Sequence, residues 1–149
     1  MSFQNQFTKT TTDANLMETV HHGSAEYPFR YYYENIALFD FKCIDWHWHS
    51  ELEFVYIKSG NVVFDIGTVH FELNEGNGIM INSKILHRLQ SSSDAIIPNF
   101  LFQPSFIAPQ DSLIYKKYIN PVISSSLEYL VFQPDIPWQK KALEIIKKI

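Results

Sequence analysis

Cysteine is almost absent from this chain of 149 residues, because Cys43 is the only one. A single cysteine excludes an internal disulfide and favours a cytoplasmic protein. The first twenty residues lack the basic segment and apolar core of a signal peptide. Uninterrupted apolar runs are also short, and none approaches the ~20 residues of a membrane span. We therefore expect no membrane partner.

An excess of basic residues is missing too. Lys and Arg together number 12 against 16 Asp and Glu, which gives a formal net charge of −4. Binding to nucleic acid needs a basic face that neutralises phosphates, so this chain is not expected to hold DNA by itself. Apolar residues make up 46% and aromatic residues 15%, enough for one domain with a substantial core.

The pattern divides the chain into three parts. Residues 1–20 are rich in Gln, Asn, Thr and Ser, and we interpret them as a flexible N-terminal arm. Residues 21–105 form the predicted barrel, with short β-strands from about residue 29 to 103 separated by Gly, Asn or Ser turns. Within it, Ser59–Asn61 looks like the tight turn of a β-hairpin. The sequence thus predicts a mainly β domain, a sandwich or small barrel.

Residues 106–149 change to a helical period. Pro121 should break the first helix, and a second helix should begin near Asp135 and Pro137. The apolar residues of the second helix lie on one face, and we call them the apolar stripe: Trp138, Ala142, Ile145, Ile146 and Ile149.

Two histidines and a glutamate alternate in the stretch "DWHWHSELEFVYIKSG". In a regular strand His47, His49 and Glu53 point to the same side, while Trp46 and Trp48 point to the other. Two imidazoles and a carboxylate that converge inside a protein are a common ligand set for Zn, Fe, Mn, Ni or Cu. A structural alternative is that these groups only form hydrogen bonds with one another.

Other polar and aromatic residues are weaker candidates. We interpret His21 and His22 as part of a solvated loop, and His70 as a surface or cross-strand residue. The aromatic run that includes Tyr31 and Tyr33 mostly suits core packing. At the mouth of a small barrel, however, such rings can stack on a sugar or another planar ligand.

Two segments resemble the cupin motifs. "HWHSELEFVYIKSG" fits the first motif, HxH, three residues, Glu, six residues, Gly. In "GNGIMINSKILHRLQS", Gly76 and His87 fit the second motif, whereas Asn82, Lys84 and Ser91 stand where that motif has Pro, Gly and Asn. The resemblance implies a cupin double-stranded β-helix, or jelly-roll barrel, followed by C-terminal α-helices. It also implies a divalent transition metal (Zn, Ni, Fe or Mn), with these ligands: His47, His49, Glu53 and His87.

About residues 20–149 are similar to the N-terminal cupin domain of AraC-type transcription regulators. The similarity rests on "EYPFRYYYENI", "INSKILHRLQ" and the helical segment that follows "LFQP". It implies a sensor that binds a small molecule, such as a sugar, and forms a homodimer through the apolar stripe. DNA would be bound only through a further C-terminal domain. Since the last helix stops at Ile149 without a typical end signal, we expect the chain to be truncated before that domain.

Three hypotheses follow. The first is the effector-sensing and dimerisation module just described, which is not an enzyme. The second is a metal-dependent cupin enzyme, a dioxygenase or isomerase, which would use the same ligand set. The third keeps the sensor but leaves the four polar side chains free of metal. Neither the effector, the metal nor the direction of regulation can be predicted from the sequence.

Overall fold

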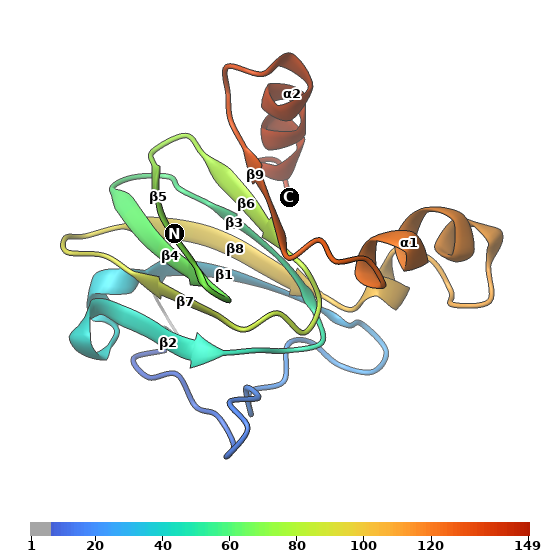
Figure 1. Ribbon diagram of the computed structural model, residues 1–149, viewed down its shortest axis with the longest axis horizontal. Coiled ribbons are helices and arrows are strands. Elements are labelled where there is room, and N and C mark those ends of the chain that lie inside the picture. The colour runs from blue at the N-terminus through green and yellow to red at the C-terminus, as the bar shows by residue number, and fades with distance from the viewer. Residues whose placement is uncertain (1–6) are drawn as a thin grey trace.

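The computed structural model describes residues 7–149, so the first six residues of the predicted arm lie outside it. Two antiparallel sheets face each other, and two helical segments project from them (Figure 1). The five-stranded sheet has the order β1 (Phe29–Asn35), β8 (Ile96–Phe102), β3 (Leu52–Tyr56), β6 (Gly78–Ile81) and β9 (Tyr129–Phe132). The four-stranded sheet has the order β2 (Cys43–His47), β7 (His87–Gln90), β4 (Asn61–Ile66) and β5 (Val69–Asn74).

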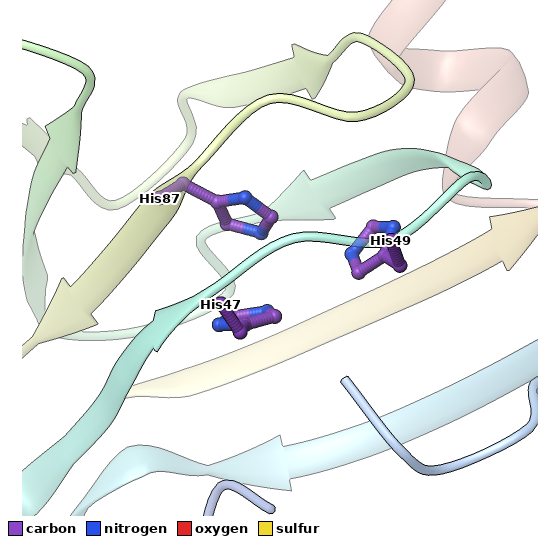
Figure 2. Close-up of side chains that lie close together, drawn as sticks. All are labelled: His47, His49 and His87. Carbon is purple, nitrogen blue, oxygen red and sulfur yellow. The ribbon is translucent and has the colours of Figure 1, made fainter. Parts of the chain in front are cut away.

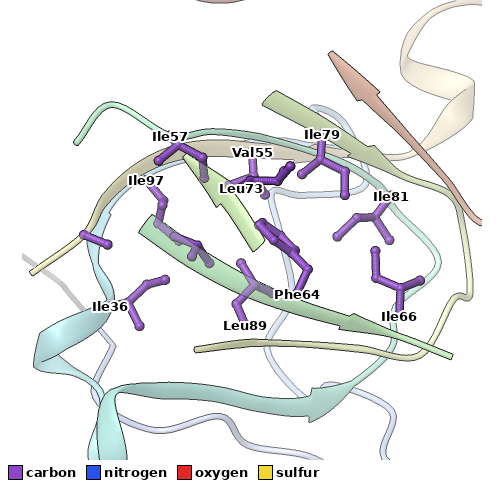
Figure 3. Close-up of a cluster of buried hydrophobic side chains, with 12 residues drawn as sticks. Ile36, Val55, Ile57, Phe64, Ile66, Leu73, Ile79, Ile81, Leu89 and Ile97 are labelled. Atoms are coloured by element: carbon purple, nitrogen blue, oxygen red, sulfur yellow. The ribbon is translucent and has the colours of Figure 1, made fainter. Parts of the chain in front are cut away.

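The space between the two sheets holds the main core. Alternate residues of facing strands point into it, as the period of two in β-strands requires. Figure 3 shows these side chains between the sheets: Ile36, Val55, Ile57, Val62, Phe64, Ile66, Leu73, Ile79, Ile81, Leu89, Ala95 and Ile97. The predicted mainly β cupin jelly roll is thereby confirmed.

The connection between β3 and β4 differs from the prediction. These strands do not pair with each other, because β3 pairs with β6 and β8 while β4 pairs with β5 and β7. The predicted hairpin is therefore wrong, and the turn at Ser59–Asn61 carries the chain from one sheet to the other. Gly60 is required there, since its φ is +81° and an added Cβ would lie 2.5 Å from the carbonyl oxygen of Asp94.

A second apolar layer covers the outer face of the five-stranded sheet. Its buried residues are Leu52, Phe100 and Phe102, with Phe54 packed beside them. The rings of Phe54 and Phe100 stack with centroids 5.3 Å apart. Ile123 and Ile146, from the two helical segments, pack on this layer. The sheet is thus apolar on both faces, and its outer face attaches the C-terminal helices.

The first helical segment continues through Pro121, so the predicted break is wrong. A π-helical turn, Tyr115–Ile119, leads directly into α1, Asn120–Ile123. In the wider turn the N–H of Asn120 donates to the carbonyl of Tyr115. A proline lacks the N–H and clashes with the preceding helical turn, and the widened turn accommodates it.

Helix α2, Pro137–Ile146, lies beside β9 (Figure 1). Leu143 is its most buried residue and packs on Gly78 of β6, where an added Cβ would lie 2.7 Å from Leu143 Cδ2. The apolar stripe only partly faces the barrel. Ala142 and Ile146 are half-buried, whereas the rest of it is exposed: Trp138 (59%), Ile145 (57%) and Ile149 (59%). Among residues 7–149 no helix has the length and apolar character needed to cross a membrane.

Candidate functional site

Three histidine rings converge at one end of the barrel interior (Figure 2). His47 ends β2, His87 begins β7 directly opposite it, and His49 lies in the link that leads to β3. The ring centroids of His47 and His87 are 4.2 Å apart, and those of His49 and His87 are 5.2 Å apart. One nitrogen of each ring lies within 4.8 Å of the others. All three side chains are buried.

Glu53 reaches the same point from the opposite sheet. It is the second residue of β3, and its Oε2 lies 3.0 Å from Nε2 of His87 and 3.9 Å from Nε2 of His49. The sequence predicted that His47, His49 and Glu53 lie on one continuous strand. In the structure the chain leaves β2 after His47 and crosses to the other sheet before Glu53. The structure therefore brings all four predicted ligands together, although by a different route from the predicted one.

The second nitrogen of each histidine fixes its ring. Nδ1 of His47 lies 2.7 Å from the carbonyl oxygen of Asp45, and Nδ1 of His87 lies 2.7 Å from that of Ile85. Nδ1 of His49 lies 3.1 Å from the carbonyl oxygen of Glu51. Since a carbonyl only accepts, each Nδ1 carries the proton and the Nε2 atoms face the cluster.

Burial and charge set the protonation of the cluster. Desolvation lowers the pKa of both His47 and His49 to about 4, so these rings are neutral near pH 7. Burial opposes charge on His87 and Glu53 as well, but their mutual hydrogen bond and attraction outweigh it. The pKa of Glu53 is therefore lowered and that of His87 raised.

The cluster fits a divalent transition metal. Nε2 of His49 is buried and finds no hydrogen-bond partner among residues 7–149. Such unsatisfied atoms are rare in folded proteins, and coordination would satisfy this one. Neutral imidazole nitrogens together with one carboxylate are a donor set that Zn, Ni, Fe and Mn accept. The role of the four residues as metal ligands stays a prediction.

A small cavity adjoins the cluster inside the barrel. His47 and Glu53 line it, together with Tyr32 and Glu34 of β1 and Asn99 of β8. Its volume is about 40 Å³, little more than the ≈ 30 Å³ that a water molecule occupies in the liquid. Residues of the N-terminal segment line it from the other side: Phe7, Lys9, Thr10, Glu18, Val20 and His22. The arm thus forms part of the cavity wall.

The contacts of His22 were not predicted from the sequence. Its Nδ1 lies 2.6 Å from the hydroxyl of Tyr32, and its Nε2 lies 2.7 Å from a carboxylate oxygen of Glu18. Its ring centroid is 5.7 Å from that of His49. The predicted solvated loop is wrong for His22, which is 7% exposed. No local pattern reveals this position, because it depends on where the arm packs.

Glu34 and Asn99 form a second polar pair in the cavity. Asn99 Nδ2 donates to Glu34 Oε2 over 3.0 Å, and burial raises the pKa of Glu34 to about 7. Both residues occupy inward positions of neighbouring strands. In the register of β1 and β8, Asn99 lies opposite Tyr32, two residues from Glu34. Strand parity could have identified Glu34 as a cavity residue, since Tyr32 and Glu34 lie on the same side of β1.

Tyr31 and Tyr33 do not lie at the histidine cluster. They point to the outer face of the five-stranded sheet, where they line a separate groove with Tyr56 and Phe100. The reason is the alternation of side chains in β1, which turns Tyr32 inward and its two neighbours outward. A ligand-binding role for Tyr31 and Tyr33 stays a prediction, but it belongs to the outer groove and not to the cavity.

Comparisons with known proteins agree with this architecture. The jelly roll and its buried cluster of three histidines and a glutamate define a cupin. Residues 39–109 match the model of the AraC-like ligand binding domain. These residues are therefore similar to an AraC-like ligand-binding domain, which agrees with the resemblance predicted from the sequence.

A curated relative extends the match along the chain. An uncharacterized HTH-type transcriptional regulator of Bacillus subtilis (strain 168), YdeC, is 34% identical over 140 residues, which cover 92% of this chain and 47% of that protein. The chain thus spans about half the length of the curated relative it matches.

Two solved structures show the range of structural similarity. A cupin-2 domain containing protein from Shewanella frigidimarina has 13% identity and a TM-score of 0.45, covering 51% of this chain and 72% of that chain. An oxalate decarboxylase from Bacillus subtilis with Mn(II) centres has 21% identity and a TM-score of 0.39, covering 41% and 18%. These similarities are too low to indicate a shared function.

Proposed function

We propose that this chain is the effector-sensing and dimerisation module of an AraC-type transcription regulator, located in the cytoplasm. The observation that carries the proposal is the buried polar cluster beside a small cavity, in a chain whose residues 39–109 match an AraC-like ligand-binding domain. A small polar effector, such as a sugar, would bind there. DNA would be bound by a separate domain, as the relative's description as an HTH-type regulator suggests.

The effector cannot enter without a movement of the arm. Pockets for small molecules have volumes of ≈ 300–1,000 Å³, whereas this cavity has about 40 Å³. The effector would have to displace Glu18 of the arm and His22, which follows the arm; both line the cavity together with His47. An effector that binds the open arrangement more tightly than the closed one shifts the equilibrium between them. A coupling of ~1–3 kcal/mol is typical of such switches.

Thermal shift and calorimetric titration of the purified chain with a panel of sugars and sugar acids test the sensor proposal. A true effector should raise the melting temperature of the chain. The matched variant Asn99→Leu, which removes a polar group of the cavity, should respond less than the variant Asn61→Leu on the exposed end of β4. If no small polar molecule stabilises the chain, the sensor proposal is contradicted.

A metal at the cluster would be held by His47, His49, His87 and Glu53. When bound, a divalent ion acts as a Lewis acid that can anchor an oxygen of the effector. The rings that would hold the metal are already oriented, since the Nδ1 proton of each histidine is bound by a backbone carbonyl.

Metal content is tested by elemental analysis of protein purified without a nickel column, and by titration with Zn²⁺ or Co²⁺. We expect about one equivalent to bind, and His49→Ala should weaken binding at least about tenfold because it removes a ligand. His21→Ala, an exposed histidine outside the cluster, is the control. Equal affinity in both variants would show that the four side chains only form hydrogen bonds.

One observation favours the alternative of a metal-dependent cupin enzyme. Glu34, with its pKa raised to about 7, lies in the same cavity as the cluster and could exchange a proton with a bound substrate. An enzyme should turn over a substrate when Fe or Mn is added, and should lose this activity in both His47→Ala and Glu34→Gln. A sensor should show no turnover in any of the three proteins.

A further inference from the structure

A second concave site lies outside the barrel, between the outer face of the five-stranded sheet and the last turn of α2. We call it the outer groove. Its walls come from β1, β3 and β8 on one side, and from Ile146, Lys147 and Ile149 on the other. Its volume is about 370 Å³, against about 40 Å³ for the cavity in the barrel. Unlike that cavity, the outer groove has the size of a ligand pocket (≈ 300–1,000 Å³) without any rearrangement.

The groove has an apolar, largely aromatic floor. Tyr31, Tyr33 and Tyr56 line it together with Phe100, which is 6% exposed. Ile146 closes one side and packs on the aromatic layer of the sheet. Flat aromatic surfaces of this kind bind the apolar body of a ligand by stacking and by exclusion of water.

Two lysines give the groove a positive rim. Lys58 donates from Nζ to the hydroxyl of Tyr33 over 2.8 Å, and its Nζ lies 5.0 Å from the centre of that ring. On the other side, Nζ of Lys147 lies 4.8 Å from the centre of the Tyr56 ring. These cation–π contacts hold both ammonium groups over the groove. None of the lining side chains, all within the described residues 7–149, is acidic.

This local charge is opposite to that of the whole chain, which is −4. The positive rim is therefore a local feature of the groove and does not reflect the overall charge of the chain. A ligand that matches both floor and rim has an apolar body and one negative group. We propose that the outer groove binds an amphipathic organic carboxylate, with its apolar part on the tyrosine and phenylalanine rings and its carboxylate between Lys58 and Lys147.

Such a ligand would contact the sheet and α2 at the same time. Because α2 rests on the barrel mainly through Leu143 and Ile146, a bound carboxylate would hold its last turn more firmly in place. The ligand would thus act on the position of the C-terminal helix without entering the barrel. The binding site itself does not depend on the sensor role proposed for the cavity.

The test uses two probes, octanoate and 3-phenylpropionate, with the neutral amides octanamide and 3-phenylpropionamide as controls. Calorimetry measures affinity, and NMR spectra of the isoleucine methyl groups locate the probe. We expect the carboxylates to bind more tightly than the amides. They should shift the methyl signals of Ile146 and leave those of Ile81, which lies in the barrel core, unchanged.

Variants separate the two lysines from general charge effects. The double variant Lys58→Met/Lys147→Met should weaken carboxylate binding about tenfold, since exposed ion pairs each contribute a few-fold. The matched control Lys116→Met/Lys140→Met changes the net charge equally, at exposed positions outside the groove, and should bind as the unchanged chain does.

Three results would overturn the proposal. The first is equal binding of carboxylates and amides, and the second is equal affinity of the two double variants. The third is a shift of the Ile146 signals with protein concentration when no probe binds, because a second copy of the chain would then occupy the groove.

Discussion

At the scale of single residues, Glu34 links the cavity to pH. It is 8% exposed, and its carboxylate accepts a hydrogen bond from Asn99. That bond favours the charged form, but desolvation outweighs it and raises the pKa to about 7 from an ordinary value of 4.5. The folded chain therefore holds this proton over a range of pH in which the unfolded chain has already released it.

We predict that Glu34→Gln removes a pH-dependent loss of stability. Below about pH 4.5 Glu34 is protonated in both states and costs nothing. As the pH rises from there to about 7, only the unfolded state ionises, so the free energy of unfolding falls by up to roughly 3 kcal/mol. Denaturant unfolding at pH 5 and pH 8 should show that the variant gains stability relative to the unchanged chain as the pH rises.

The difference between the two proteins isolates Glu34 and the groups coupled to it, because titrating groups away from the cavity contribute equally to both. A control variant, Glu72→Gln on the exposed side of β5, should run parallel to the unchanged chain across this range. A constant difference between Glu34→Gln and the unchanged chain from pH 5 to pH 8 would contradict the raised pKa.

At the scale of elements, the described part of the arm packs along the link after β2. The amide of Glu18 donates to the carbonyl of Trp48 over 2.9 Å, and the amide of Trp48 donates to the carbonyl of Leu16 over 3.0 Å. The side chain of His22 adds its bonds to Glu18 and Tyr32. The division into arm, barrel and dimerisation segment, and the mobility of the arm, stay predictions.

We predict that His22→Ala loosens the arm. Loss of two buried hydrogen bonds, one of them charged, costs about 1–3 kcal/mol. Hydrogen exchange at the amides of Glu18 and Trp48 should therefore become about tenfold faster or more, while amides of β4 keep their protection. His21→Ala, at the exposed neighbouring residue, serves as the control. Unchanged exchange at both amides in His22→Ala would show that His22 does not hold the arm.

Strand parity accounts for most of what the sequence predicted about the site. It placed His47, His49 and Glu53 on one side, and the cupin resemblance added His87. Parity could not reveal that the chain changes sheets between His47 and Glu53, because both sheets show the same alternation. The hairpin predicted at Ser59–Asn61 failed for the same reason, since pairing partners are chosen by contacts distant in sequence.

At the scale of the whole molecule, the sequence predicted the jelly roll and the later helices but not how they meet. The arm lacks a periodic pattern, so its position over the cavity depends on the completed barrel. The outer face of the five-stranded sheet is apolar because helices cover it, and Phe54 and Phe100 therefore look like core residues in the sequence. Strand β9 interrupts the segment predicted to be helical, because it completes this sheet beside β6.

The apolar stripe is relevant to assembly, because Trp138, Ile145 and Ile149 are exposed. Trp138, Ala142, Ile145 and Ile149 follow one another at intervals of four, three and four residues, which is the spacing of a helix–helix seam. The barrel contact of α2 is centred on Leu143, and of the stripe Trp138 also touches the barrel, through the ring of Phe132. Large apolar side chains that remain exposed on one face of a helix indicate a further contact. A two-fold axis through this face would bury the same residues on both copies.

We predict that Ile145→Lys dissociates the proposed homodimer. A lysine in the centre of the seam would bring a charge into an apolar contact, which should raise the dissociation constant at least about tenfold. Glu144→Lys places the same residue one position earlier, off the seam, and should leave the dimer intact. Sedimentation equilibrium measures association, and circular dichroism checks that both variants fold. A monomeric unchanged chain at every concentration, or equal association of the two variants, would show that the stripe does not form the dimer contact.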